Sequence, residues 1–344
     1  MRNFAAENDP REKGFFMPGE WQEHTCCWMA WPCRSGLWAD SLATKIAYAD
    51  VANNISRFEV VKMLVPMNKI ESAKKLLNKS IDIIEMSIDD SWCRDSGPNF
   101  LINNDGDLAG STWEFNAWGK KYQPYDQDAL MGSRILKLAG ANEYISLLVA
   151  EGGGITVDGE GTIITTESCF LNTNRNPNWK KSEVEEELCR TLGASKVIWI
   201  PGDPDETETD GHIDGIAAFI EPGRVLLEIN KDKTDPHYHV GEKNRKALQS
   251  QKDAKGRKIE IEFISEGIYH AGIWNGGCSS YVNSYLANGA VIVPGYGYDR
   301  DGEAVEVYEN IYPKREVIQV PINDIAIGGG GIHCITQQQP TVKN

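Results

Sequence analysis

Five side chains in this sequence are of types that could carry out a reaction together. They are Asp95, Glu151, His212, Asp214 and Cys334, and each stands in a short polar or glycine-rich segment. A cysteine can supply a nucleophile, and histidine is the usual acid or base at neutral pH. If the fold gathers these residues around one cavity, the site holds one nucleophile, one acid/base and three carboxylates.

Three carboxylates in one cavity require a positive partner, because like charges raise each other's pKa. A metal ion is one such partner. The other is a guanidinium group, whose planar donors pair with carboxylates in a bidentate manner. Cys334 favours the guanidinium, since a thiolate beside a bound cation is stabilised.

The chemistry that these residues could perform is hydrolysis of the guanidinium group. Asp95 and Asp214 would hold its nitrogens and place its carbon over the sulfur of Cys334. His212 would protonate the leaving ammonia and then activate water against the thiouronium intermediate. Glu151 would either orient His212 or hold a guanidinium nitrogen, and this scheme needs neither a metal nor an organic cofactor.

Glycine runs stand beside two of these side chains. Gly152–Gly154 follows Glu151, and Gly328–Gly331 precedes Cys334. Glycines allow a ligand or another backbone to approach closely, so Gly331 is included among the substrate-binding candidates. The plain alternative is a flexible turn in the first case and a glycine-rich hairpin in the second.

Trp92 lies three residues before Asp95, and its ring could form the wall of a cation site. The other tryptophans at Trp28, Trp31, Trp113 and Trp118 are expected in the core. An Arg-Asp pair before Gly-Pro, as at Asp95, can also be an ordinary turn with an ion pair on the surface.

His212 and Asp214 are expected on one strand. Residues two apart on a strand share a face, so their side chains would point the same way. His333, next to Cys334, would point to the opposite face and is expected to be structural.

The apolar pattern and the turn signals predict pairs of strands alternating with helices. The predicted strand pairs are Pro98–Asn103 with Asp107–Trp113, Gly153–Val157 with Gly161–Thr166, Ile213–Ile220 with Arg224–Ile229, and Ser280–Leu286 with Ala290–Pro294. Further strands are predicted at Thr25–Trp31, Glu59–Val65, Glu316–Val320 and Ile332–Thr336. Helices are predicted at Asp40–Arg57, Tyr125–Leu138, Ser182–Leu192 (capped by Ser182 and Glu185), Glu242–Ser250 and Glu303–Ile311.

A strand–helix–strand unit thus recurs roughly every 50 to 70 residues, which indicates a ring of similar modules. If the first and last strands share one unit, the ring closes with five modules. The alternative is an ordinary mixed α/β sheet. In a ring, the polar segments fall at similar places in successive modules and point to one centre.

Composition limits the possible partners. The chain has 344 residues, 41% of them hydrophobic, and a formal net charge of −15. An acidic surface disfavours nucleic acid and anionic membranes and attracts cationic ligands. No apolar stretch is long enough to span a membrane, and the polar start of the chain predicts no signal peptide.

The eight cysteines contain no C-x-x-C pair, so no structural zinc site is indicated. Without a signal peptide, a reducing compartment is expected. Most of the cysteines would then be small buried hydrophobic residues.

Taken together and in order, the motifs resemble those of the agmatine deiminases, which belong to the guanidino-group-modifying enzymes of the pentein superfamily and are related to bacterial-type peptidylarginine deiminases. The matching segments cover nearly the whole chain: Met17–Trp21, Trp28–Pro32, Trp92–Pro98, Glu151–Gly153, Thr209–Gly215, Gly328–Cys334 and Thr336–Pro340. One segment departs from the family pattern. After Trp118 the family usually has two glycines, whereas this chain has Gly119 and Lys120.

The resemblance implies a five-module pseudo-symmetric α/β-propeller, formed as one domain over residues 1–344. It implies Cys334 as nucleophile, His212 as acid/base, Asp95 and Asp214 as guanidinium ligands, and Glu151 in the catalytic set. The reaction would convert agmatine into N-carbamoylputrescine and ammonia, a step towards putrescine. We also expect a cytoplasmic homo-oligomer, with a dimer favoured.

Substrate choice depends on the tail of the guanidine compound. An arginine deiminase needs basic residues for the α-carboxylate of its substrate, whereas agmatine ends in an ammonium group. The acidic stretch Asp203–Asp210 would suit that ammonium, and Glu208 is the candidate ligand. The alternative is a solvated acidic loop.

Three other functions remain open at this point. The chain could deiminate free arginine or peptidylarginine. It could be a metal-dependent hydrolase with His212, Asp214 and Asp95 as ligands. It could also be a propeller-shaped interaction module with a degenerate site, although the complete catalytic set argues against that.

Overall fold

The computed structural model describes residues 9–37, 41–267, 277–298 and 300–342. Its strands form five small sheets, and all five follow one plan. Two antiparallel strands come first, and a third strand then pairs in parallel with the second. A helix connects the second strand to the third, as a parallel connection requires.

Four of the sheets are continuous in sequence. They consist of β4 (Asn99–Ile102), β5 (Leu108–Glu114) and β6 (Asn142–Val149); β7 (Ile155–Val157), β8 (Thr162–Thr166) and β9 (Lys196–Ile200); β10 (Ala217–Glu221), β11 (Arg224–Ile229) and β12 (Glu260–Ser265); and β13 (Tyr285–Ala287), β14 (Ala290–Gly295) and β15 (Glu316–Pro321). Their connecting helices are α5 (Met131–Ala139), α7 (Lys181–Leu192), α8 (Pro236–Gln249) and α9 (Arg300–Ile311).

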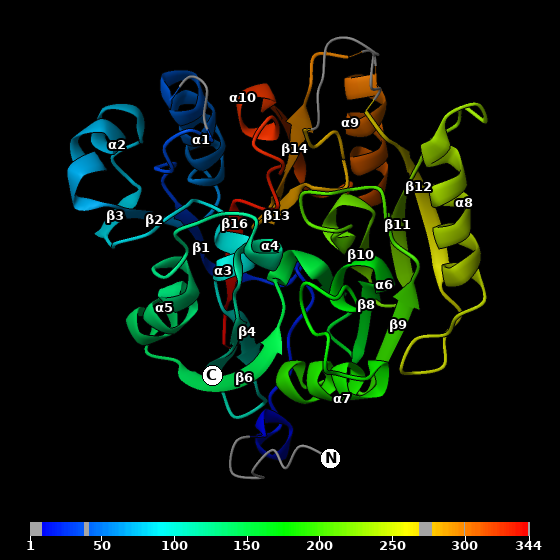
Figure 1. The fold of residues 1–344 in the computed structure, drawn as a ribbon. Helices are drawn as coiled ribbons and strands as arrows, with labels where there is room; N and C mark the ends of the chain where they lie inside the picture. The colour runs from blue at the N-terminus through cyan, green and yellow to red at the C-terminus, as the bar shows by residue number, and fades with distance from the viewer. Residues whose placement is uncertain (1–8, 38–40, 268–276, 299, 343–344) are drawn as a thin grey trace.

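The fifth sheet closes the ring. It contains β1 (His24–Ala30), β2 (Val60–Val65) and β3 (Asp82–Glu85), and its first strand is β16 (Thr336–Pro340) from the far end of the sequence. Met29 lies opposite Thr336 in the antiparallel pair of β1 and β16. Figure 1 shows the modules following one another around the molecule, with β16 beside β1. The five-module α/β prediction, with the first and last strands in one unit, is confirmed.

Further helices complete the modules. α1 (Ser41–Ile55) connects β1 to β2, and α2 (Ile70–Leu76) precedes β3. The remaining helical segments are short: α3 (Cys93–Ser96), α4 (Ala117–Lys120), α6 (Glu167–Phe170), α10 (Asn323–Ala326) and the 3-10 turns Pro10–Lys13, Met67–Lys69, Asp128–Leu130, Gly152–Gly154 and Ile213–Gly215. None of the helices that the structure describes has the length and apolar character needed to cross a bilayer.

Two predicted helix starts are wrong. α5 begins at Met131 instead of Tyr125, after the 3-10 turn at Asp128–Leu130. α8 begins at Pro236, since Asp235 accepts a hydrogen bond from the backbone of His237 and so caps the helix earlier. The predicted helix Asp40–Arg57 corresponds to α1, and its first residue lies outside the described residues.

The predicted cap of α7 is also wrong. The helix begins at Lys181, and Glu183 accepts a hydrogen bond of 2.7 Å from the backbone N–H of Lys180. Glu185 lies beyond the cap and accepts instead from the indole N–H of Trp199 at 2.7 Å.

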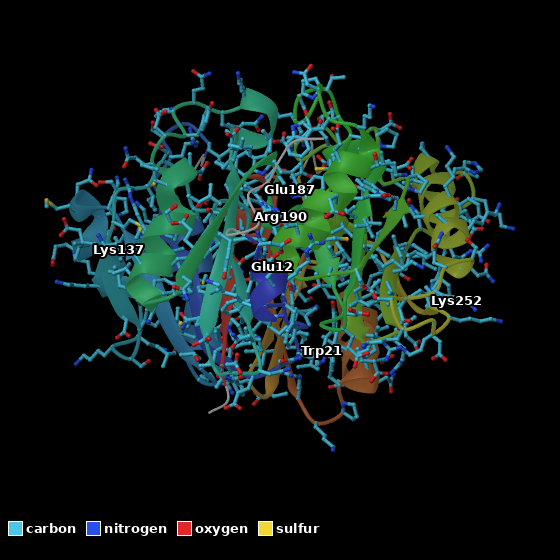
Figure 2. The ribbon with its side chains drawn as sticks, turned by 90° about the horizontal axis from the view of Figure 1, so that it is seen from below. Glu12, Trp21, Lys137, Glu187, Arg190 and Lys252 are labelled. Atoms are coloured by element: carbon cyan, nitrogen blue, oxygen red, sulfur yellow. The ribbon has the colours of Figure 1, made fainter. Side chains whose placement is uncertain are left out.

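A buried ion pair on α7 is hydrogen-bonded to the neighbouring module that contains β6. Glu187 and Arg190, neighbours on α7 in Figure 2, lie 2.6 Å apart. Glu187 also accepts a hydrogen bond of 2.5 Å from Ser146 on β6. Each charge is therefore compensated where it is buried, as burial of charged groups requires.

Candidate active site

The five predicted functional residues all precede the first strand of a module. Asp95 lies in α3 before β4, and Glu151 precedes β7. His212 and Asp214 precede β10, and Cys334 precedes β16. All five side chains are buried, with 0–6% of their surface exposed. The equivalent positions in four modules therefore point to one interior region.

Gly153 marks the point where three of these side chains meet. A methyl group on Gly153 would lie 2.6 Å from Nδ1 of His212, 2.7 Å from Oδ1 of Asp95 and 2.9 Å from Oδ2 of Asp214. Such distances are too short for a carbon atom. The glycine run after Glu151 thus allows three side chains to approach the backbone closely, whereas the sequence predicted the approach of a ligand or another backbone.

Asp95 is held from two sides. The backbone N–H of Gly153 donates to Oδ1 and the indole N–H of Trp118 donates to Oδ2, both at 3.0 Å. Burial raises the pKa of Asp95 to about 6, although the charge of His212 opposes the increase. Trp118 was expected to be core and is indeed buried, but its polar edge contacts the site.

His212 lies between two carboxylates. Its Nε2 is 3.3 Å from Oε2 of Glu151, and its Nδ1 is 3.7 Å from Oδ1 of Asp95. Among the described residues, Nδ1 has no hydrogen-bond partner and is buried. Burial would lower the pKa of His212, but the charge of Asp95 and its other neighbours raises it well above the usual value.

Glu151 is paired with a cation that the sequence analysis did not identify. Arg175 Nε lies 2.7 Å from Oε1 of Glu151, and both side chains are fully buried. Burial would raise the pKa of Glu151, but Arg175 and His212 together lower it. An ionised Glu151 can therefore accept a hydrogen bond from the Nε2–H of His212.

The sulfur of Cys334 contacts two polar groups. Nδ2 of Asn283 donates to it at 3.2 Å, and Oδ2 of Asp214 lies 3.5 Å away. Burial, together with the charges of Asp214 and Asp95, raises the pKa of the Cys334 thiol well above its ordinary value. The resting site thus favours the thiol.

Asn283 was not predicted, yet it occupies the equivalent place in the remaining module, two residues before β13. Its Oδ1 accepts the backbone N–H groups of His333 at 2.9 Å and of Cys334 at 3.3 Å. A methyl group on Gly331 would lie 2.6 Å from that oxygen. Gly331 therefore packs closely against Asn283 beside the nucleophile, and its contact with substrate stays a prediction.

Two strand predictions at the site are wrong. Residues Ile213–Gly215 form a 3-10 turn, and β10 begins only at Ala217. β16 begins at Thr336, so Cys334 lies in a turn instead of the predicted strand Ile332–Thr336. The prediction that His333 faces away from the site fails for this reason: its Nδ1 lies 2.9 Å from Oδ2 of Asp214.

Trp92 and Glu208 border the glycine run before Cys334. A methyl group on Gly330 would lie 3.1 Å from the sulfur of Cys334 and would overlap the ring of Trp92. A methyl group on Gly329 would lie 3.2 Å from Cγ of Glu208. Glu208 accepts a hydrogen bond of 2.6 Å from the hydroxyl of Tyr122 and is only partly buried.

The short segment α4, which carries Trp118, has an unusual backbone. Ala117, Trp118, Gly119 and Lys120 all have positive φ angles, and the value for Lys120 is 65°. A residue with a side chain rarely adopts this conformation. The departure from the family pattern thus places a lysine where the backbone favours glycine.

Two groups of side chains in the described ranges have donor atoms close enough to share a metal ion: Glu151, Cys169 and His212, and the partly exposed Asp235, His237 and Glu266. The set of His212, Asp214 and Asp95 does not form such a group. The guanidinium of Arg175 already neutralises Glu151 at 2.7 Å, which disfavours a second cation there. Asp95 and Asp214, the other acidic groups of the site, both lie beside Gly153 and suit an organic cation better.

Comparisons with known proteins agree with this arrangement. The sequence profile of the Porphyromonas-type peptidyl-arginine deiminase family matches residues 16–340. The agmatine deiminase of Stutzerimonas stutzeri is 39% identical, and the match covers 96% of this chain and 97% of that protein.

Two solved structures are also similar. The agmatine deiminase of Enterococcus faecalis superposes with a TM-score of 0.95 at 34% identity, covering 98% of this chain and 99% of that one. A cysteine-to-serine variant of the C. jejuni agmatine deiminase with substrate bound superposes with a TM-score of 0.86 at 25% identity, covering 96% and 97% of the two chains. On these matches, the chain belongs to the Porphyromonas-type peptidyl-arginine deiminase family and is a homologue of the agmatine deiminases.

Proposed function

We propose that the protein hydrolyses agmatine to N-carbamoylputrescine and ammonia through a covalent intermediate on Cys334. The observation that carries the proposal is a cluster of buried side chains: His212, Asp95 and Asp214 meet beside Gly153, and the thiol of Cys334 lies 3.5 Å from Asp214. The named activity of the similar proteins supports the same reaction. The role of each residue follows from its surroundings.

Asp95 and Asp214 are the proposed guanidinium ligands. Their oxygens lie close to the same point beside Gly153. Burial would raise the pKa of Asp214, but His333 and His212 lower it overall, so this carboxylate is ionised. A planar cation between the two carboxylates satisfies both, and Trp92 supplies an apolar wall.

Substrate binding would also ionise the nucleophile. The guanidinium carbon must approach the sulfur of Cys334, and its positive charge stabilises the thiolate. A unit charge about 4 Å from the sulfur contributes about 4 kcal/mol at an effective dielectric constant of about 20. The buried cysteine thus becomes reactive when its substrate arrives.

The first half of the reaction forms a carbon–sulfur bond. The thiol of Cys334 loses its proton to solvent as the cation binds, and the thiolate attacks the guanidinium carbon to give a tetrahedral adduct. His212, through its unpartnered Nδ1, donates a proton to a terminal nitrogen, the carbon–nitrogen bond breaks and ammonia leaves. A thiouronium group remains on Cys334.

The second half breaks that bond again. Neutral His212 takes a proton from water, and the resulting hydroxide attacks the thiouronium carbon. The adduct loses its hydroxyl proton and collapses, the carbon–sulfur bond breaks, and the urea product leaves while the thiolate of Cys334 takes up a proton again. Glu151 orients His212 in both halves, because its contacts are with Nε2 and with Arg175.

Glu208 is the proposed ligand of the substrate's ammonium group, since it is the partly buried acid beside the glycine run. Replacing it with glutamine should raise the KM for agmatine about tenfold with little change in kcat. Steady-state kinetics check this, with Asp205→Asn as a control because Asp205 is an exposed acid of the same loop. An unchanged KM in Glu208→Gln would exclude this role.

The pH dependence should reflect Asp95. Because its pKa is raised to about 6, the protonated, neutral form predominates below that pH and no longer binds a cation. We expect kcat/KM for agmatine to fall roughly tenfold for each pH unit below about 6. A profile that stays flat to about pH 4, the ordinary range for an aspartate, would contradict this.

Gly153→Ala should reduce kcat/KM by roughly a hundredfold or more, because the added methyl group displaces His212, Asp95 and Asp214 together. Gly215→Ala is the matched control, since a methyl group there meets no atom within 4 Å. Activity assays and thermal unfolding of both variants separate a damaged site from a damaged fold. Equal activities in the two variants would show that the space at Gly153 is not used.

The proposal is tested by incubating the protein separately with agmatine, free arginine and a blocked peptidylarginine and measuring ammonia. Release from agmatine, insensitive to a strong chelator and abolished by thiol alkylation, is the expected result. Release mainly from arginine or the peptide would agree with the proposed reaction at the guanidinium group. It would contradict agmatine as the substrate and Glu208 as the ligand of its ammonium group. Activity lost to the chelator would favour the metal-dependent hydrolase.

We infer that the chain works as one domain, in the cytoplasm, and as a homodimer. Analytical ultracentrifugation of the purified protein tests the last of these, and a monomer at working concentration would exclude it.

A further inference from the structure

Two series of charged side chains begin beside Gly153, one at Asp95 and the other at Asp214. The residue types follow the same order in both series. In the first, Asp95 is followed by His212, Glu151 and Arg175. In the second, Asp214 is followed by His333, Glu20 and Arg94. Each series therefore places an imidazole between two carboxylates and ends in an arginine.

The two imidazoles differ in how tightly they are held. Nδ1 of His212 has no hydrogen-bond partner among the described residues. His333 has a carboxylate oxygen 2.9 Å from each nitrogen: Oδ2 of Asp214 at Nδ1 and Oε1 of Glu20 at Nε2. A ring bonded at both nitrogens cannot give a proton to a substrate without breaking a contact, so only His212 suits acid/base work.

The geometry also indicates the charge of His333. An imidazole donates from both nitrogens only as the imidazolium, and ionised carboxylates only accept. Glu20 additionally accepts from Nη1 of Arg94 at 3.3 Å, which indicates that it is ionised. Burial and Arg94 would lower the pKa of His333, but Glu20 and Asp214 raise it overall.

The backbone of His333 is fixed as well. Its N–H donates to Oδ1 of Asn283 at 2.9 Å, and its carbonyl oxygen accepts from Nε of Arg94 at 3.4 Å. The same asparagine contacts the sulfur of the adjacent Cys334. The imidazolium and the nucleophile thus share one rigid support.

We propose that His333 is a positioning residue, a permanent imidazolium that keeps Asp214 ionised and aimed at the guanidinium site before substrate binds. This inference rests on the proposed function of the same site and adds a residue to it. Without the imidazolium, Asp214 would be a buried carboxylate 3.5 Å from a thiol and close to Asp95, with burial favouring its protonated form. A protonated Asp214 would bind the cation poorly.

Two variants of His333 separate the contact with Asp214 from the contact with Glu20. In His333→Asn the amide NH₂ can take the place of Nδ1 and donate to Asp214, whereas in His333→Gln it can take the place of Nε2 and reach Glu20. We expect the KM for agmatine to rise about tenfold or more in His333→Gln, and clearly less in His333→Asn. His239→Asn, at an exposed histidine, is the control for the exchange itself.

A second measurement does not depend on agmatine. Nitrogen NMR of the unsubstituted protein with labelled histidine should show both ring nitrogens of His333 protonated at pH 7, above the ordinary pKa of histidine of about 6.5. The signal is assigned by its loss in His333→Asn. The charged groups that face this ring are Glu20, Asp214 and Arg94.

The outcomes distinguish the two proposals. A neutral His333 at pH 7, or equal KM values in the Asn and Gln variants, would overturn the positioning role. If the unsubstituted protein does not hydrolyse agmatine, the proposed function fails, and the NMR result alone then decides whether His333 is a fixed imidazolium.

Discussion

Cys334→Ser is expected to lower the rate of agmatine hydrolysis on the order of 10⁴-fold or more, the scale on which removal of a covalent nucleophile acts. A serine hydroxyl does not ionise under the influence of one bound cation, whereas a thiol can. Ammonia release under single-turnover conditions measures the loss. The variant should keep the fold and bind agmatine, which calorimetry can detect.

The control for this variant is Cys189→Ser, a partly exposed cysteine on α7. It should retain the activity of the unsubstituted protein. Cys169, in contact with Glu151, is the other thiol near His212. A Cys334→Ser variant with activity within tenfold of the original would move the search for the nucleophile to Cys169 or exclude a cysteine altogether.

His212→Asn should lower kcat on the order of 10³-fold, because both the departure of ammonia and the activation of water lose their proton carrier. The side chain of asparagine is shorter and does not titrate, so the pH dependence contributed by His212 should also disappear. Stopped-time assays across pH 6 to about 9 measure both effects. The flanking Glu151 and Asp95 remain in place, which keeps the binding site charged.

His239→Asn serves as the matched control here too, since it makes the same exchange at an exposed position. If His212→Asn lost less than tenfold in kcat, or kept the original pH profile, another group would have to carry the proton. His333 would then be the first alternative, because it is the other imidazole at the site.

The functional residues could be predicted because they combine a rare chemical type with a regular place in the chain. Asp95, Glu151, His212 and Cys334 all stand just before the first strand of a module, and the repeat is visible in the sequence. Asn283 lies two residues before β13, as Cys334 lies two residues before β16, so the same position in its module would have identified it. It was missed because a neutral amide gives no chemical signal by itself.

Arg175 could not be predicted for a different reason. It lies in a polar segment between α6 and α7 that looks like an ordinary surface loop, and only the fold shows that its side chain is buried against Glu151. His333 was placed on the wrong face because a strand was expected where the four glycines lead into a turn. Near glycine runs, the alternation of faces that holds in a strand does not apply.

The plan of the ring was predicted, but several strands were not. The third strands β6, β9 and β12 were overlooked, and β12 shows why, because only two of its six residues are buried and its sequence carries two glutamates. An outer strand without a continuous apolar face gives little periodic signal. β12 pairs with β11 in parallel, and the helix α8 that connects the two strands brings them together.

Acid quenching during turnover of agmatine, followed by mass spectrometry of the peptides, tests the central claim most directly. The account predicts a thiouronium adduct on the peptide that contains Cys334, present only while substrate remains and absent in Cys334→Ser. An adduct on another cysteine would contradict covalent catalysis by Cys334. So would continued ammonia release without any adduct, measured under conditions in which hydrolysis of the thiouronium intermediate is slow.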